Sequence, residues 1–150
     1  MRLNLLTGKW EEDKPKKKNS LPERDVEKEI DSFLKSNGIY SRVIKSDGRK
    51  LPNGKWIPSR QGRGISDRIA ILHPKGRFLA IEIKASGKRS SASEEQIMFL
   101  TMIIQMGGIG VVADSVECVK KALAMSKQEL LDYLPEIKKE YPQTSLEPLF

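Results

Sequence analysis

The stretch that decides the fold is Gly64-Ile65-Ser66-Asp67-Arg68-Ile69-Ala70-Ile71-Leu72-His73-Pro74-Lys75-Gly76-Arg77-Phe78-Leu79-Ala80-Ile81-Glu82-Ile83-Lys84. Two isoleucine-rich runs flank a short turn with proline and glycine, a pattern that is typical of a β-hairpin. Successive side chains of a strand point to opposite faces, so Leu79, Ile81 and Ile83 are predicted to lie on one face. Glu82 and Lys84 are predicted to lie on the other face.

The turn also predicts which residues face each other across the hairpin. A two-residue loop at Pro74-Lys75 would pair His73 with Gly76 and, further along the ladder, Asp67 with Glu82. Directly opposed residues have Cβ atoms about 4.5–5.5 Å apart, and like charges at this distance destabilise a sheet. The two carboxylates therefore predict a Mg²⁺ site with the ammonium of Lys84 beside it. The alternative is a half-exposed face whose charges carry no function.

The charge of the chain points to a polyanionic partner. The 150 residues carry a formal net charge of +7, and the surplus of cations lies before the hairpin. A basic surface of this kind suits the phosphate backbone of a nucleic acid, although solubility alone would also explain it. The segment 40–63 has one acidic residue, Asp47, against Arg42, Lys45, Arg49, Lys50, Lys55, Arg60 and Arg63.

Composition limits the remaining classes of protein. The length suits one domain with a modest core. Cys118 is the single cysteine, so no intrachain disulfide is possible, and a reducing, cytoplasmic location is expected. Cys118 itself is interpreted as a buried structural thiol. No apolar run is long enough for a transmembrane helix, so no membrane association is predicted.

The first part of the chain predicts an arm followed by a helix. Residues 1–19 show no sustained period and are predicted to form a flexible basic arm. Ser20-Leu21-Pro22-Glu23 has the pattern of a helix capping box, with apolar residues following at helical spacing. Asn37-Gly38 predicts the end of this helix, and 39–44 reads as a strand.

Residues 45–63 form a basic insertion, with a tight turn predicted at Asn53-Gly54. Trp56 lies among cationic residues, and this combination suits stacking on bases or contact with the DNA backbone. An equally good interpretation is that Trp56 anchors its loop to the core.

The second half of the chain predicts a helix, a strand and two more helices. Ser93-Glu94-Glu95-Gln96 is a second capping box, and its helix ends at Gly107-Gly108. An apolar, buried strand follows at 109–113, and helices begin near Asp114 and near Ser126. The domain therefore spans 20–141, with a C-terminal tail at 142–150. Its predicted class is α/β, with a mixed central β-sheet flanked by helices.

The motifs Gly-Ile-Ser-Asp at 64–67 and Ile-Glu-Ile-Lys at 81–84, with Gln96 downstream, resemble the VRR-NUC branch of the PD-(D/E)XK nucleases. The resemblance covers about residues 22–125, and Asp114-Ser115-Val116-Glu117 after an apolar strand also fits it. Ser66 stands where the superfamily name has proline. The resemblance implies a restriction-endonuclease-like core and a metal-dependent endonuclease. It also implies activity on branched DNA such as four-way junctions, and a homodimer would supply the two sites needed for paired cuts.

The same resemblance suggests roles for individual residues. Asp67, Glu82 and the backbone carbonyl of Ile83 are expected to bind Mg²⁺ or Mn²⁺, for which oxygen ligands are suited. Lys84 is expected to position an attacking water and to stabilise growing negative charge. Glu27 is expected to bind a second metal or its water.

Two of these assignments have alternatives. Glu23 is the other carboxylate that the first helix offers, although its capping role already accounts for it. Gln96 is expected to orient the site, but it is also the ordinary capping partner of Ser93. The residues expected to bind DNA are Arg49, Lys50, Lys55, Trp56, Arg60, Arg63, Lys88 and Arg89. His73, the single histidine, is interpreted as a turn residue.

Two other functions remain open from the sequence. A non-catalytic nucleic-acid-binding protein would use the same basic surface without hydrolysis. A site-specific restriction enzyme would use the same fold on plain duplex DNA.

Overall fold

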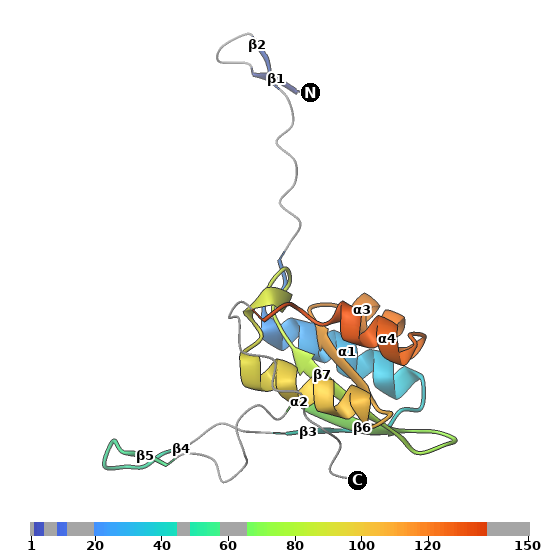
Figure 1. Cartoon of the computed structure of the whole chain (residues 1–150). Coiled ribbons are helices and arrows are strands. Elements are labelled where there is room, and N and C mark those ends of the chain that lie inside the picture. Colours follow the sequence, from blue (N-terminus) through green and yellow to red (C-terminus); the bar gives the residue numbers. More distant parts are fainter. Residues whose placement is uncertain (1, 5–8, 12–19, 45–48, 58–65, 138–150) are drawn as a thin grey trace.

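The computed structural model describes residues 2–4, 9–11, 20–44, 49–57 and 66–137 (Figure 1). Its elements are, in order, β1 (Arg2–Asn4), β2 (Lys9–Glu11), α1 (Glu23–Ser36), β3 (Ser41–Val43), β4 (Arg49–Lys50), β5 (Trp56–Ile57), β6 (Arg68–Leu72), β7 (Arg77–Ile83), a 3₁₀ turn (Arg89–Ser91), α2 (Glu94–Gln105), β8 (Ile109–Ala113), α3 (Val116–Leu123) and α4 (Lys127–Tyr133).

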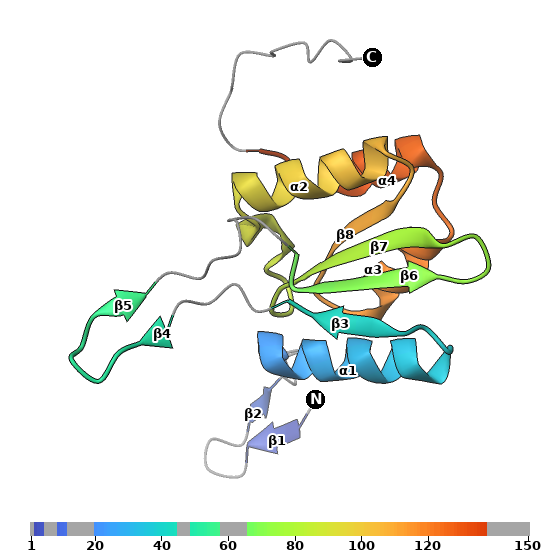
Figure 2. The same cartoon turned by 90° about the horizontal axis from the view of Figure 1, so that it is seen from below.

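The centre of the fold is a four-stranded mixed sheet in the order β3-β6-β7-β8. The pairs β3/β6 and β6/β7 are antiparallel, whereas β7 and β8 run parallel. A parallel pair needs a crossover connection, and α2 supplies it. Helices α1 and α2 lie on opposite sides of the sheet (Figure 2). The predicted α/β class with a mixed, helix-flanked sheet is confirmed.

The register of the central hairpin agrees with the prediction, but its loop does not. Leu72 pairs with Arg77 and Arg68 pairs with Ile81, which is the offset that brings Asp67 opposite Glu82 one step further on. The loop has four residues, 73–76, and not two. The last pair of the ladder lies one residue earlier on β6 and one residue later on β7 than predicted, so the offset is unchanged.

The core forms on both faces of the hairpin. On one face, the fully buried Leu79, Ile81 and Ile83 belong to the same apolar cluster as the inner side of α1. On the other face, Ala80 packs with Leu100 of α2. Complete burial of a leucine or isoleucine side chain contributes about 1.5–3 kcal/mol. Because α2 covers the second face, the expectation of a half-exposed face is wrong at the position of Glu82.

A close contact between α2 and β8 sets the position of that helix. A Cβ atom at Gly110 would lie 2.9 Å from the backbone oxygen of Leu100 and 3.2 Å from its Cβ atom. Only glycine lets the two backbones approach this closely. The middle of α2 is therefore held close against β8.

The ends of α1 show one wrong prediction and one confirmed prediction. The residue that precedes the helix is Pro22, in an extended conformation, and no side chain caps it. The capping box at Ser20 is therefore wrong, because the helix begins too late for Ser20 to reach its first turn. At the other end, Gly38 adopts φ +68° and the N–H of Ile39 donates to the Leu34 carbonyl, as Asn37-Gly38 predicted.

Two small hairpins lie outside the central sheet. In the basic insertion, β4 and β5 pair antiparallel, so a hairpin with a turn at this place is confirmed. The turn contains Gly54 at φ +83°, but the register makes it longer than a two-residue turn at Asn53-Gly54. β4 and β5 lie on the side of the sheet where β6 begins and β7 ends (Figure 2). Strands β1 and β2 also pair, within a segment for which no regular structure was predicted. The predicted tail at 142–150 lies outside the described residues.

The described helices offer no membrane-spanning segment, since none of them combines the required length with sufficient apolar character.

Candidate active site

Asp67 and Glu82 come together at the open end of the β6–β7 hairpin. The Asp67 carboxylate accepts a hydrogen bond of 2.8 Å at Oδ2 from the backbone N–H of Ile83. Glu82 is 1% exposed, although it is a carboxylate. Both acidic groups are therefore held in place: Asp67 by a hydrogen bond across the hairpin, and Glu82 by its burial beneath α2.

One oxygen of the Glu82 carboxylate is well bound and the other is not. Gln96 donates from Nε2 to Glu82 Oε1 over 2.6 Å, and the Lys84 ammonium lies 3.4 Å from the same oxygen. Glu82 Oε2 is buried and has no hydrogen-bond partner among the described residues. An unpaired buried carboxylate oxygen costs several kcal/mol in a dry site, so this atom needs a proton, a water or a cation as its partner.

Gln96 closes the capping box, which confirms that role, and the same side chain also contacts Glu82. The side-chain Oε1 of Gln96 accepts from the backbone N–H of Ser93 over 2.8 Å. The backbone N–H of Gln96 donates to Ser93 Oγ, which completes the capping box. Because the amide oxygen faces a donor, the amide nitrogen must point the other way, toward Glu82. The start of the helix therefore aims a fixed N–H donor at the carboxylate.

Glu82 has a strongly perturbed acidity. The pKa of Glu82 is raised to about 8. Burial is the largest cause, and the negative charge of neighbouring Asp67 is the next. A hydrogen bond between the two carboxyl groups contributes in the same direction, whereas the ammonium of Lys84 lowers the pKa. Such a bond needs a proton on one carboxyl. When both groups are ionised, neither has a hydrogen to donate, and Oε2 is left without a partner.

This donor set fits a hard divalent cation. Two carboxylates face each other, and a buried oxygen between the sheet and α2 lacks a partner. In the described parts of the chain, no group of three or more His, Cys, Asp and Glu side chains is placed to hold a metal. Mg²⁺ is often bound by only one or two carboxylates together with waters and substrate phosphates, so the pair is sufficient in kind. The Ile83 carbonyl stays a predicted further ligand.

Glu27 occupies a different position from the other predicted residues. Its Oε1 lies 3.5 Å from Nη2 of Arg68, a residue that is 5% exposed and bonded to Asp31 and Ser41 on its other nitrogen. Arg68 follows Asp67 on the strand and points to the α1 face. Glu27 therefore lies with Arg68, on the face opposite Glu82.

The segment just before α1 is tied to the loop that follows Lys84. The N–H of Leu21 donates to Ser86 Oγ over 3.1 Å, and the N–H of Ser86 donates to the Leu21 carbonyl over 3.0 Å. Glu23 follows Leu21 by two residues. No local pattern predicted this tether, which brings the start of α1 toward the loop after Lys84.

The predicted DNA-binding residues other than Arg89 divide into three groups. Lys50, Lys55, Trp56 and Lys88 are exposed. Trp56 is 68% exposed, so the interpretation that it anchors its loop to the core is wrong. Arg49 lies in β4, and Arg60 and Arg63 lie outside the described residues.

Arg89 is engaged within the fold. Its Nε donates to the Val112 carbonyl over 2.7 Å and its Nη2 to the Tyr133 carbonyl over 2.8 Å, while the guanidinium lies 4.1 Å from the centre of the Tyr133 ring. Asp114 assists nearby by accepting from the N–H of Gly87 over 2.9 Å. Together they fasten the loop between β7 and α2. Charge alone pointed to phosphate binding and gave no indication of these backbone carbonyls.

The remaining two single residues agree with their interpretations. His73 lies exposed in the hairpin loop. Cys118 is 6% exposed and its thiol donates to Asp114 Oδ1 over 3.2 Å, so it is a buried structural thiol with a local partner.

Comparison of the chain with protein-family models, with curated proteins and with solved structures gives no match.

Proposed function

We propose that the chain is a metal-dependent endonuclease that hydrolyses DNA phosphodiester bonds and selects branched structures such as four-way junctions. The proposed core is restriction-endonuclease-like, of the VRR-NUC type. One observation carries the proposal: the buried Glu82 carboxylate faces Asp67 with an unpartnered Oε2, while Gln96 and Lys84 hold its other oxygen. A purely structural acid would not need a second carboxylate beside it.

Each residue has a distinct task in this proposal. Asp67 and Glu82 would hold Mg²⁺ or Mn²⁺, with the Ile83 carbonyl and substrate oxygens as further ligands. The bound ion would supply charge stabilisation at the phosphate and a water of lowered pKa. Gln96 keeps Glu82 in place. The Lys84 side chain, 15% exposed, brings a positive charge to where negative charge develops.

The exposed cationic residues would bind the DNA backbone. Lys50 and Lys55 extend from the β4–β5 hairpin beside Trp56, and Lys88 lies in the loop after β7. The described part of that hairpin, 49–57, contains no acidic residue. Contacts of this kind make affinity fall steeply with salt.

A cleavage assay tests the proposal. Labelled four-way junction, flap and linear duplex are incubated with the chain in Mg²⁺ and in EDTA, and we expect cleavage of the branched DNAs only with Mg²⁺. Lys84→Ala is expected to slow cleavage by about 10²–10⁴-fold and Asp67→Ala at least as much, with DNA binding retained. Lys75→Ala is the matched control, because Lys75 is an exposed lysine in the loop at the far end of the same hairpin.

The same assay separates the competing functions. Binding without cleavage of any DNA would favour the non-catalytic nucleic-acid-binding protein, for which the exposed cationic hairpin is the supporting observation. Sequence-dependent cutting of linear duplex would favour a restriction-type enzyme. Undiminished cleavage by pure Asp67→Ala protein would refute the catalytic assignment.

A metal titration decides which carboxylate of α1 takes part. The resemblance favours Glu27, whereas its ion pair with Arg68 competes with that role, and the tether between Leu21 and Ser86 favours Glu23. Glu27→Gln and Glu23→Gln are compared for the Mg²⁺ concentration that gives half-maximal cleavage. The variant that needs more Mg²⁺ identifies the participating carboxylate.

A further inference from the structure

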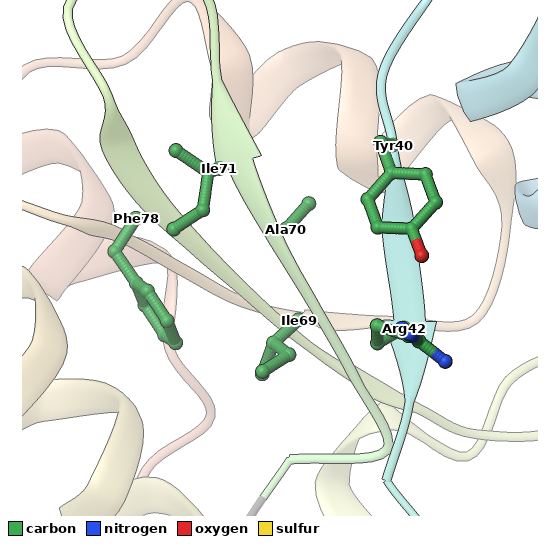
Figure 3. Close-up of a pocket in the computed structure, with 6 residues that line it drawn as sticks. All are labelled: Tyr40, Arg42, Ile69, Ala70, Ile71 and Phe78. Carbon is green, nitrogen blue, oxygen red and sulfur yellow. The ribbon is translucent and has the colours of Figure 1, made fainter.

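The sheet face next to the candidate site carries a hollow that none of the predicted site residues lines. Its walls come from β6, from Phe78 of β7, and from Tyr40 and Arg42 at the edge strand β3 (Figure 3). Arg42 pairs with Ile69, which follows Asp67 by two residues on the same face. The hollow and the two carboxylates therefore lie on the same face of the sheet.

The side chains of this surface are unusually exposed for their chemistry. Tyr40 is 71% exposed and Ile71 is 58% exposed, because α2 covers β7 and β8 and leaves this part of the sheet open. Contiguous apolar surface with a polar rim is typical of a binding site. An exposed aromatic ring above an apolar floor suits the flat face of a nucleobase.

The charge of the hollow favours an anionic ligand. Arg42 is the charged residue among those that line it, and none of the lining residues is acidic. The Arg42 guanidinium lies 5.8 Å from the centre of the Tyr40 ring, and the structure shows no ion pair between Arg42 and Asp67. Arg42 and Asp67 are diagonal neighbours across two antiparallel strands, for which the separation is about 7–8 Å.

We propose that Tyr40 and Arg42 form a nucleotide subsite beside the carboxylate pair. Arg42 binds the phosphate next to the one held at Asp67 and Glu82, and Tyr40 with Ile69 and Ile71 binds the base of that nucleotide. The inference rests on the proposed nuclease function and narrows its substrate class. A base that lies on the sheet cannot remain stacked in a duplex, so the preferred DNA has an unpaired nucleotide beside the cleaved bond.

Binding measurements with paired and gapped DNA test this inference. The probes are a labelled duplex with a short gap of unpaired thymidines, the same duplex fully paired, and the gapped duplex with abasic unpaired positions. All are titrated with the Lys84→Ala protein in Mg²⁺, so that the DNA stays intact. We expect Tyr40→Leu to weaken binding of the gapped duplex by about 10-fold and to leave the paired duplex within about 2-fold.

Removal of the bases should reproduce the effect of removing the ring. The abasic probe is expected to bind about 10-fold less tightly, and Tyr40→Leu should then have no additional effect, because both changes remove one contact. Tyr40→Phe keeps the ring and should retain the preference. Arg42→Gln is expected to reduce the salt dependence of binding by about one phosphate contact.

Val43→Ala is the matched control. Val43 is an apolar residue of the same edge strand, 45% exposed, and it pairs with Arg68 on the other face. Its replacement should change the affinity for neither the gapped nor the paired duplex. Equal loss of affinity for both duplexes in Tyr40→Leu, or no loss, would overturn the inference. A lower molecular mass of Tyr40→Leu than of the natural chain, measured by light scattering, would also overturn it. That result would identify the hollow as a contact between two copies of the chain.

The outcomes also separate this inference from the proposed function. A Tyr40-dependent preference for unpaired bases, without any Mg²⁺-dependent cleavage by the natural chain, would leave the subsite standing and reject the nuclease. Mg²⁺-dependent cleavage that is abolished in Lys84→Ala, together with equal binding of paired and gapped DNA, would reject the subsite and leave the nuclease.

Discussion

At the scale of single residues, the site depends on one amide that serves two structures. Gln96 closes the capping box of α2 with its oxygen and holds Glu82 with its nitrogen. The helix start and the carboxylate are thereby coupled. A change at Gln96 affects stability and the site together, unless the substitution keeps one of the two bonds.

Substitutions at Gln96 and Ser93 separate the two bonds. Gln96→Glu keeps a side chain suited to the capping box but replaces the N–H donor with a second carboxylate against Glu82. We expect a loss of about 10–100-fold in the cleavage rate, as is typical when a partner of a metal ligand is removed. Ser93→Ala should cost about 1 kcal/mol of the free energy of unfolding and leave the cleavage rate nearly unchanged. Equal cleavage rates in the two variants would contradict the proposed role of Gln96.

The acidity of Glu82 predicts a pH dependence of stability. Without metal, folded Glu82 keeps its proton up to about pH 8, whereas the unfolded chain loses it near its ordinary value of 4.5. The free energy of unfolding should therefore fall as pH rises from about 4.5 to about 8, by up to roughly 5 kcal/mol, and level off above that. Glu82→Gln should remove this decline. Urea unfolding in EDTA across this range measures it, and parallel curves for the two proteins would contradict the prediction.

Mg²⁺ should compete with the proton for the Glu82 carboxylate. The carboxylate must lose its proton to bind Mg²⁺, so stabilisation by Mg²⁺ should grow as pH rises toward about 8. Melting temperatures with and without Mg²⁺ at several pH values measure this effect. Glu82→Gln serves as the control and should show no such growth.

At the scale of elements, the loop between β7 and α2 links the two halves of the site. It connects Lys84 to the first turn of α2. Arg89 fastens it to β8 and α4, and Asp114 fastens it to the segment between β8 and α3. The hydrogen bonds of Arg89 to two backbone carbonyls hold this loop in place. For Lys88, its exposed neighbour, phosphate binding stays a prediction.

The pair Arg89→Gln and Lys88→Gln tests this division. Arg89→Gln removes two hydrogen bonds to backbone carbonyls, and we expect a loss of about 1–3 kcal/mol of the free energy of unfolding. The salt dependence of DNA binding should not change. Lys88→Gln should leave stability within about 0.5 kcal/mol and lower the salt slope by about one contact. Urea unfolding and DNA titrations at several salt concentrations give both quantities.

At the scale of the whole molecule, the proposal includes a homodimer. Paired cuts in a two-fold symmetric junction need two sites, which a dimer supplies through its symmetry. We expect light scattering to give about twice the mass of the 17.0 kDa chain at the concentrations at which junctions are cleaved. A monomer under these conditions would contradict this part of the proposal and leave the metal site unaffected.

Local patterns were sufficient for most of the secondary structure. The helix from Ser93, the buried strand at 109–113 and the end of α1 at Gly38 are set by capping, apolar runs and backbone freedom, which act over a few residues. The capping box at Ser20 failed because the chain stays extended through Pro22. The predicted hairpin loop had two residues and the observed loop has four, 73–76, but both lengths give the same pairing of the two strands.

Side-chain partners could not be predicted where they come from distant parts of the chain. Arg89 and Lys88 have similar charges and adjacent positions, yet only the fold brings backbone carbonyls of β8 and α4 to Arg89. The same applies to Glu27, whose partner is Arg68, and to the open hollow beside Tyr40, which depends on where α2 ends its cover of the sheet.

The sequence by itself determined the hairpin register, because side chains alternate strictly along strands and one offset fixes every pair from Arg68 to Leu72. Only the tertiary structure decided which acid was buried, because burial depends on the helix that lies above the strand. By placing α2 over Glu82, the fold raised the pKa of that carboxyl to about 8 and left Oε2 without a partner.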